Sequence, residues 1–95
     1  MARPVMELLD LLGRRWALRV IWELRGDTGL TFRELQSRCS EVSSSVLSQR
    51  VRELTEADVV GRDEGGYVLT PRGRSLFELL RPLDEWARKW ARSRR

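Results

Sequence analysis

Apolar residues recur at helical spacing through the first quarter of the chain. A first helix is predicted from Pro4, which suits an opening turn, to Gly13, a candidate C-terminal cap; its apolar face holds Val5, Leu8, Leu9 and Leu12 at i, i+3, i+4 and i+7. A second helix is predicted from Arg14 to Arg25. Because this segment is apolar on nearly every side, we expect it to be central, with part of its surface against a second subunit.

The next segment has the spacing of two short helices joined by a tight turn. Thr31 and Glu34 match a capping box, and the residues after them place Phe32, Leu35 and Cys39 on one face. Residues 40–42 then form a turn, and Ser43 is a second N-cap for a helix that runs to about Ala57. Two helices joined in this way predict a helix-turn-helix.

The second of these two helices has an apolar stripe and a polar outer face. Leu47, Val51 and Leu54 form the stripe, and a step of about 100° per residue puts the opposite face at Ser45, Gln49, Arg52 and Glu56. Short side chains at the start of that face would let the helix approach the floor of a DNA groove. A plain solvated face is the equally simple alternative.

A hairpin and a long helix complete the predicted elements. Residues 59–62 and 67–70 are predicted to form two short strands, and the glycines of the 63–66 turn supply positive φ angles. Thr70 and Pro71 form an N-cap and first-turn pair for a last helix, in which Pro82 is expected to cause a kink or a restart. Its apolar positions are Leu76, Leu80, Leu83, Ala87 and Trp90.

Composition limits the classes of protein that this chain can belong to. Ninety-five residues with 41% hydrophobic and 34% charged side chains predict one domain, residues 1–95. With no histidine and one cysteine, Cys39, the chain lacks imidazole-based catalysis, an internal disulfide and a cysteine–histidine zinc site, so we expect neither an enzyme nor a cofactor. The absence of a long apolar stretch predicts a cytoplasmic protein without membrane contact.

The net charge of +4 is unevenly distributed. Residues 86–95 hold five basic side chains and no acidic one, whereas residues 1–85 carry 13 basic and 14 acidic side chains. The basic surplus therefore lies in the C-terminal tail, of which residues 91–95 are the end. Such a tail either binds nucleic acid or simply keeps the protein in solution.

Four separated motifs resemble the HxlR-type regulators of bacteria, relatives of the MarR group. They are LLGRRW at 11–16, LTFREL at 30–35, VLSQRVRELTEA at 46–57 and YVLTPRG at 67–73. The resemblance implies a winged helix-turn-helix, mainly α with a small two-stranded β-hairpin. It also implies a homodimeric, DNA-binding transcription regulator that dimerises through its first and last helices.

The chain departs from the family pattern at three places. Arg3 precedes Pro4 where many members carry a sensor cysteine, so oxidant sensing is not expected, and Cys39 is predicted to be a buried small residue. The short hairpin carries Asp63 and Glu64 at its tip, and these carboxylates would be repelled by phosphates. Asp58 stands where the family usually has a glycine, and aspartate tolerates a left-handed backbone less easily.

The leading hypothesis is sequence-specific binding of an inverted repeat in double-stranded DNA by a homodimer; the alternative is a winged helix used for protein interaction. The candidate DNA-binding residues are Thr31, Arg33, Ser43, Ser44, Ser45, Ser48, Gln49, Arg50, Arg52 and Arg62. For Arg50, pairing with a neighbouring acid is the competing expectation. The candidate dimer residues are Val5, Leu8, Leu9, Leu12, Trp22, Leu79, Leu83, Trp86 and Trp90. A small aromatic effector between subunits, enclosed by Trp16, Trp22, Trp86 and Trp90, competes with a packed dimer core.

Overall fold

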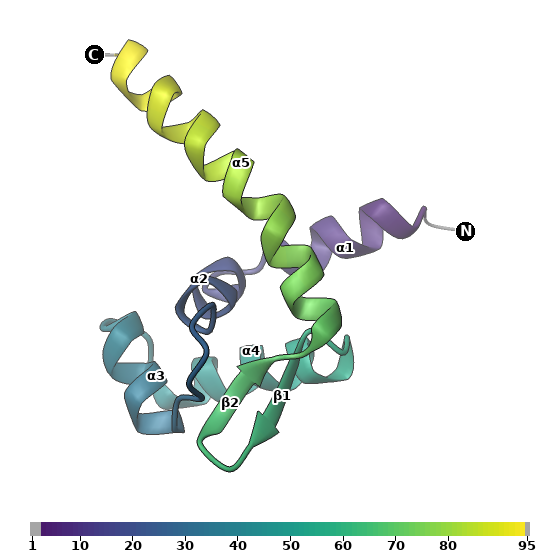
Figure 1. Ribbon diagram of the computed structural model, residues 1–95, viewed down its shortest axis with the longest axis vertical. Helices are drawn as coiled ribbons and strands as arrows, with labels where there is room; N and C mark the ends of the chain where they lie inside the picture. The colour runs from purple at the N-terminus through teal and green to yellow at the C-terminus, as the bar shows by residue number, and fades with distance from the viewer. Residues whose placement is uncertain (1–2, 95) are drawn as a thin grey trace.

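The computed structural model describes residues 3–94 and has the element order of a winged helix-turn-helix (Figure 1). Four helices come first: α1 (Pro4–Leu12), α2 (Ala17–Glu23), α3 (Phe32–Cys39) and α4 (Ser44–Glu56). The antiparallel hairpin of β1 (Val60–Asp63) and β2 (Gly66–Leu69) follows, and α5 (Pro71–Ser93) ends the chain. The predicted fold class is therefore confirmed.

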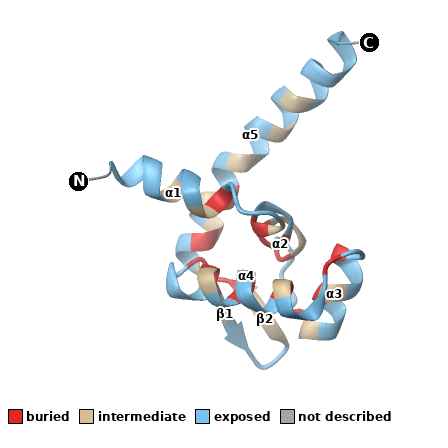
Figure 2. Ribbon diagram, turned by 180° about the vertical axis from the view of Figure 1, so that it is seen from behind, coloured by how far each residue is buried: buried red, intermediate tan, exposed pale blue. Residues whose placement is uncertain are grey.

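One apolar core holds the helix-turn-helix, the hairpin and the start of α5 together. The apolar stripe predicted on α4 is buried, and on α3 Leu35 and Cys39 are buried while Phe32 is partly buried against the core. The largest fully buried side chains include Ile21, Leu35, Leu47 and Leu54. Figure 2 shows buried residues gathered around α2 and the elements next to it, whereas the far half of α5 is mostly exposed. The central position predicted for the second helix is thus confirmed.

Side-chain caps fix where α3, α4 and α5 begin. Thr31 and Glu34 form the predicted capping box, with the Glu34 amide donating to Thr31 Oγ1 and the Thr31 amide donating to Glu34 Oε1. These bonds from the Thr31 backbone and side chain lower the pKa of Glu34. Ser43 Oγ accepts from the Val46 amide, and Thr70 Oγ1 accepts from the Gly73 amide. Each cap contributes about 1 kcal/mol to the stability of its helix.

The second helix is shorter than the sequence predicts. It begins at Ala17 rather than Arg14 because Trp16 has a left-handed backbone, with φ of 78°, and residues 13–16 turn the chain between α1 and α2. A residue with a bulky side chain loses about 1–2 kcal/mol of conformational stability when its backbone adopts left-handed angles. Gly13 does end α1, with ordinary right-handed angles.

The hairpin is offset by one residue from the predicted strands and is fastened to a third segment. Its pairing runs from Val60 with Leu69 to Asp63 with Gly66, and Gly66 alone of the two turn glycines has a positive φ, of 125°. Outside the hairpin, the Leu30 amide donates to the Tyr67 carbonyl at 3.0 Å, and the Tyr67 amide donates back at 2.7 Å. The wing is therefore tied directly to the loop before α3.

The last helix is continuous through Pro82, so the predicted restart is wrong. Proline lacks the amide that would bond the carbonyl four residues earlier. Here that carbonyl belongs to Glu78, and both residues are exposed, so water can satisfy it. At the start of α5, Gly73 is buried so closely against Val59 that a Cβ atom there would lie 2.0 Å from the Val59 carbonyl oxygen. The far half of α5 projects away from the body (Figure 1).

Candidate nucleic-acid interface

The outer face of α4 carries most of the side chains predicted to contact DNA. With the apolar stripe turned into the core, Ser44, Ser45, Ser48, Gln49 and Arg52 are all exposed. Ser44 and Ser45 occupy the first turn, where backbone amides have no partner within the helix and can bond an anion. The outer face of α4 is therefore polar, and its first turn carries small side chains and backbone amides that have no partner within the helix.

The other residues predicted to contact DNA differ in whether their side chains are already bonded within the protein. Thr31, Arg33 and Ser43 are exposed, although the Thr31 and Ser43 hydroxyls already cap α3 and α4. Among residues 3–94, neither Arg33 nor Arg52 forms an ion pair, and the guanidinium of Arg62 lies 4.7 Å from the ring centre of Tyr67.

Arg50 is engaged inside the protein. Its Nε donates to the Arg15 carbonyl at 2.9 Å, and its Nη1 lies 2.7 Å from Glu53 Oε1. This confirms the competing expectation that Arg50 pairs with a neighbouring acid. Its guanidinium is therefore occupied in joining α4 to the segment between α1 and α2.

Glu53 is the centre of a cluster of four side chains that the sequence analysis did not identify. Besides Arg50, Arg14 Nη1 lies 2.7 Å from Glu53 Oε2, and Gln49 Nε2 donates to the same oxygen at 3.4 Å. Partial burial of Glu53 raises its pKa, but the hydrogen bond and charge of Arg50, with the charge of Arg14, outweigh this and lower it. The carboxyl is therefore ionised at neutral pH. The i+3 and i+4 spacings on α4 were visible in the sequence, whereas the approach of Arg14 was not.

The wing tip is acidic, as expected from Asp63 and Glu64. Both side chains are exposed, and together with Asp27 they line a shallow depression beside the turn. Asp63 Oδ1 accepts from the Gly65 amide at 2.8 Å, which stabilises the turn. Carboxylates at this tip oppose its entry into a minor groove, because the phosphates there are also negative.

The described residues contain no cluster of acidic or sulfur-bearing side chains suited to a metal ion. Cys39 is fully buried, as predicted. Burial raises the pKa of its thiol; the nearby Arg19 lowers it and Glu23 raises it. A buried, protonated thiol is a poor nucleophile, so this residue acts as a small core side chain. Over the same part of the chain, no helix is long and apolar enough to cross a membrane.

The predicted dimer residues fall into three groups. Six are large apolar side chains exposed on α1 and α5: Val5, Leu9, Leu79, Leu83, Trp86 and Trp90. Leu8 and Trp22 are partly buried against the core. Leu12 is only 9% exposed and packs in the core of the chain. Met6 and Leu18, which the prediction missed, are also exposed.

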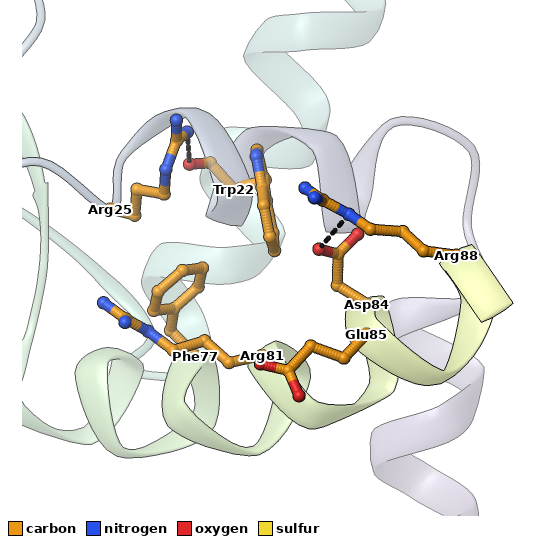
Figure 3. Close-up of a pocket in the computed structure, with 7 residues that line it drawn as sticks. All are labelled: Trp22, Arg25, Phe77, Arg81, Asp84, Glu85 and Arg88. Atoms are coloured by element: carbon orange, nitrogen blue, oxygen red, sulfur yellow. Dashed lines mark hydrogen bonds and ion pairs between the residues drawn. The ribbon is translucent and has the colours of Figure 1, made fainter.

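The four tryptophans do not form one pocket within a protomer. Trp86 and Trp90 stack on each other, whereas Trp22 meets Phe77 edge to face with ring centres 5.3 Å apart. Trp22 and Phe77 instead line an open cleft of about 390 Å³ between α2 and α5 (Figure 3). Arg25, Arg81 and Arg88 surround these rings, and Arg88 is paired with Asp84 at 3.1 Å. Asp84 and Glu85 line the same cleft and partly balance the guanidinium groups, so the two aromatic rings suit a flat molecule.

Comparison with known proteins identifies relatives of this arrangement. A family model described as HxlR-like helix-turn-helix matches residues 11–95. The uncharacterized HTH-type transcriptional regulator YvaP of Bacillus subtilis (strain 168) is 30% identical over 89 residues, which are 86% of this chain and 82% of YvaP.

Two solved structures match nearly the whole fold. Quinone-bound YodB from Bacillus subtilis has a TM-score of 0.82 at 28% identity, covering 94% of this chain and 99% of that one. A possible HxlR family transcriptional factor from Thermoplasma volcanium GSS1 also has a TM-score of 0.82, at 29% identity, covering 96% of this chain and 87% of that one.

Proposed function

The chain belongs to the HxlR-like helix-turn-helix family of transcriptional regulators, which bind DNA, and on this premise we propose that it works as a homodimer recognising a specific double-stranded sequence. Its family and relatives are transcriptional regulators and not enzymes. The polar outer face of α4 is the observation that carries the proposal. A helix with short side chains at its start can reach the base edges of a major groove.

We assign the DNA contacts to side chains that are exposed and whose polar groups are not occupied within the protein. Gln49 and Arg52 are the candidates for base edges, because glutamine pairs with adenine and arginine with guanine. Exposed hydroxyls, amides and guanidinium groups nearby are candidates for phosphates: Thr31, Arg33, Ser43, Ser44, Ser45, Ser48 and Arg62. Arg50 leaves this set because its guanidinium is occupied within the protein.

The exposed apolar side chains of α1 and α5 support the homodimer. Leu79 is 70% exposed and Trp86 is 61% exposed, on a helix whose far half projects from the body. Leaving such side chains in water forgoes about 1.5–3 kcal/mol for each one that a partner would bury. A second copy related by two-fold symmetry would present the same surface and cover it.

Selection of bound fragments from random double-stranded DNA, followed by sequencing, tests this function. We expect an inverted repeat whose half-sites lie about 10 bp, or a small multiple, apart, because two recognition helices enter successive major grooves. The variant Gln49→Ala/Arg52→Ala is the control and should lose the motif while retaining weak, salt-sensitive binding. Binding without any enriched motif would contradict the proposal.

The acidic wing tip favours one alternative function, a winged helix that binds another protein. A mobility shift against genomic fragments distinguishes the two. A protein-interaction module should give no shift at concentrations at which a regulator shifts the DNA fully. Repeating the assay with Asp63→Asn/Glu64→Gln shows whether the tip itself opposes DNA binding.

We also propose the cleft between α2 and α5 as the place where a small aromatic effector would bind. The rings of Trp22 and Phe77, the surrounding arginines and the quinone in the related YodB structure support this proposal. Benzoate, used as a probe, should quench tryptophan fluorescence in the unaltered protein and in Trp16→Phe. It should do so far less in Trp22→Phe. Equal quenching in both variants, or none in any protein, would contradict binding at this cleft.

A further inference from the structure

The amide group of Gln49 has a defined orientation. Its partner among the described residues is the Glu53 carboxylate, one turn further along α4. An ionised carboxylate only accepts hydrogen bonds, so the amide nitrogen of Gln49, and not its oxygen, must face Glu53. The usual ambiguity between amide oxygen and nitrogen is therefore removed by chemistry.

This orientation leaves a complete recognition edge free. A primary amide has two N–H groups, so the bond to Glu53 occupies one and leaves the other N–H and Oε1 without a partner among the described residues. When the occupied N–H is the one that points back toward the side-chain stem, the remaining N–H and Oε1 lie side by side. That pair matches the N7 acceptor and N6 donor of adenine in the major groove.

Glu53 is itself held in place from two directions. Its two oxygens lie 2.7 Å from Arg14 and from Arg50, and Arg50 is bonded to the Arg15 carbonyl. Its side chain is 17% exposed, whereas Gln49 is exposed on the outer face of α4. The anchor therefore extends from the outer face of α4 to the segment that joins α1 and α2.

From this geometry we propose that Glu53 is a positioning residue that presents the Gln49 amide for reading adenine without touching DNA itself. The inference rests on the proposed sequence-specific function. Holding the amide before binding saves the entropy of fixing a long side chain at the moment of contact. Glu53 would then contribute to selectivity at one base pair of each half-site.

The experiment compares binding to the selected operator and to operators substituted at single base pairs. Gln49→Ala should reduce discrimination at one position per half-site by about 5- to 150-fold. Glu53→Gln should reduce discrimination by at least about threefold at that same position only, because a glutamine there accepts either face of the amide. The double variant Gln49→Ala/Glu53→Gln should show the same discrimination at that position as Gln49→Ala alone.

Glu56→Gln is the matched control, since it removes the same charge from an exposed position of α4 and leaves the cluster around Glu53 intact. It should retain discrimination at the position concerned. If Glu53→Gln does not fold, as judged by circular dichroism, Glu53→Asp replaces it, because it keeps the charge but shortens the reach to Gln49. The same local loss of discrimination is expected.

Three results would overturn the inference. The first is Glu53→Gln retaining full discrimination at the position that Gln49→Ala loses, which would leave the proposed function intact. The second is an equal loss at every position or in Glu56→Gln, which would assign Glu53 a structural role only. The third is a Gln49→Ala protein that discriminates at every position as the unaltered protein does, which would show that Gln49 contacts no base. Failure to select any operator would instead contradict the proposed function.

Discussion

Replacing Leu83 with arginine should make the protein monomeric at micromolar concentration and weaken operator binding by about 10²- to 10⁴-fold. Leu83 is 57% exposed on α5, on the same helix as the exposed Leu79, Trp86 and Trp90. An arginine there would place an unpaired charge in the apolar interface, which costs several kcal/mol. Without the second subunit, each half-site must be bound separately, and the gain from linking two binding events disappears.

Light scattering and mobility shifts measure the two parts of this expectation. Glu85→Arg is the control, because it introduces the same side chain about 200° around α5 from Leu83. It should remain dimeric and bind the operator as before. A Leu83→Arg protein that is still dimeric by light scattering would show that α5 does not build the interface through this surface.

Replacing Gly73 with alanine should lower the free energy of unfolding by about 3 kcal/mol or more. The added methyl group would lie 2.0 Å from the Val59 carbonyl oxygen and 3.0 Å from its carbon. This carbonyl already accepts the Thr70 amide, which joins the residue before β1 to the N-cap of α5. Since backbone rather than a flexible side chain is in the way, the first turn of α5 must move away from the hairpin.

Urea denaturation followed by circular dichroism at equal protein concentration tests this effect. Gly26→Ala provides a matched control, because an added Cβ there has no neighbour within 4 Å. We expect it to change the unfolding free energy by no more than about 0.5 kcal/mol. If the two variants unfold at the same urea concentration, the close approach between Gly73 and Val59 is not a constraint on the fold.

Features that depend on neighbours in the sequence were predictable. The caps at Thr31, Ser43 and Thr70 could be predicted because a side chain reaches an amide only three residues away. The apolar stripes of α3 and α4 could be predicted because the helical period places their members on one side. The exposed positions of the recognition face follow from the same period.

Features that depend on how the chain folds back on itself were not predictable. Trp16 is left-handed and Leu12 is buried because the chain turns between α1 and α2, and no local pattern encodes that turn. The contact of Arg14 with Glu53 spans 39 positions of sequence and arises only when the segment between α1 and α2 lies beside α4. For Arg50, the i+3 acid was visible in the sequence, but the Arg15 carbonyl that holds its other nitrogen was not.

The two hydrogen bonds between Leu30 and Tyr67 determine which parts of the domain can adapt to DNA. They fasten the wing to the residues immediately before α3, so bending the wing relative to the helix-turn-helix would break both bonds. In the proposed complex, the wing and the helix-turn-helix would therefore meet the double helix as one body. Adjustment in curvature or groove width would then come from the DNA or from the angle between the subunits of the proposed homodimer, and the stiffness of base pairs that no side chain touches would contribute to selectivity.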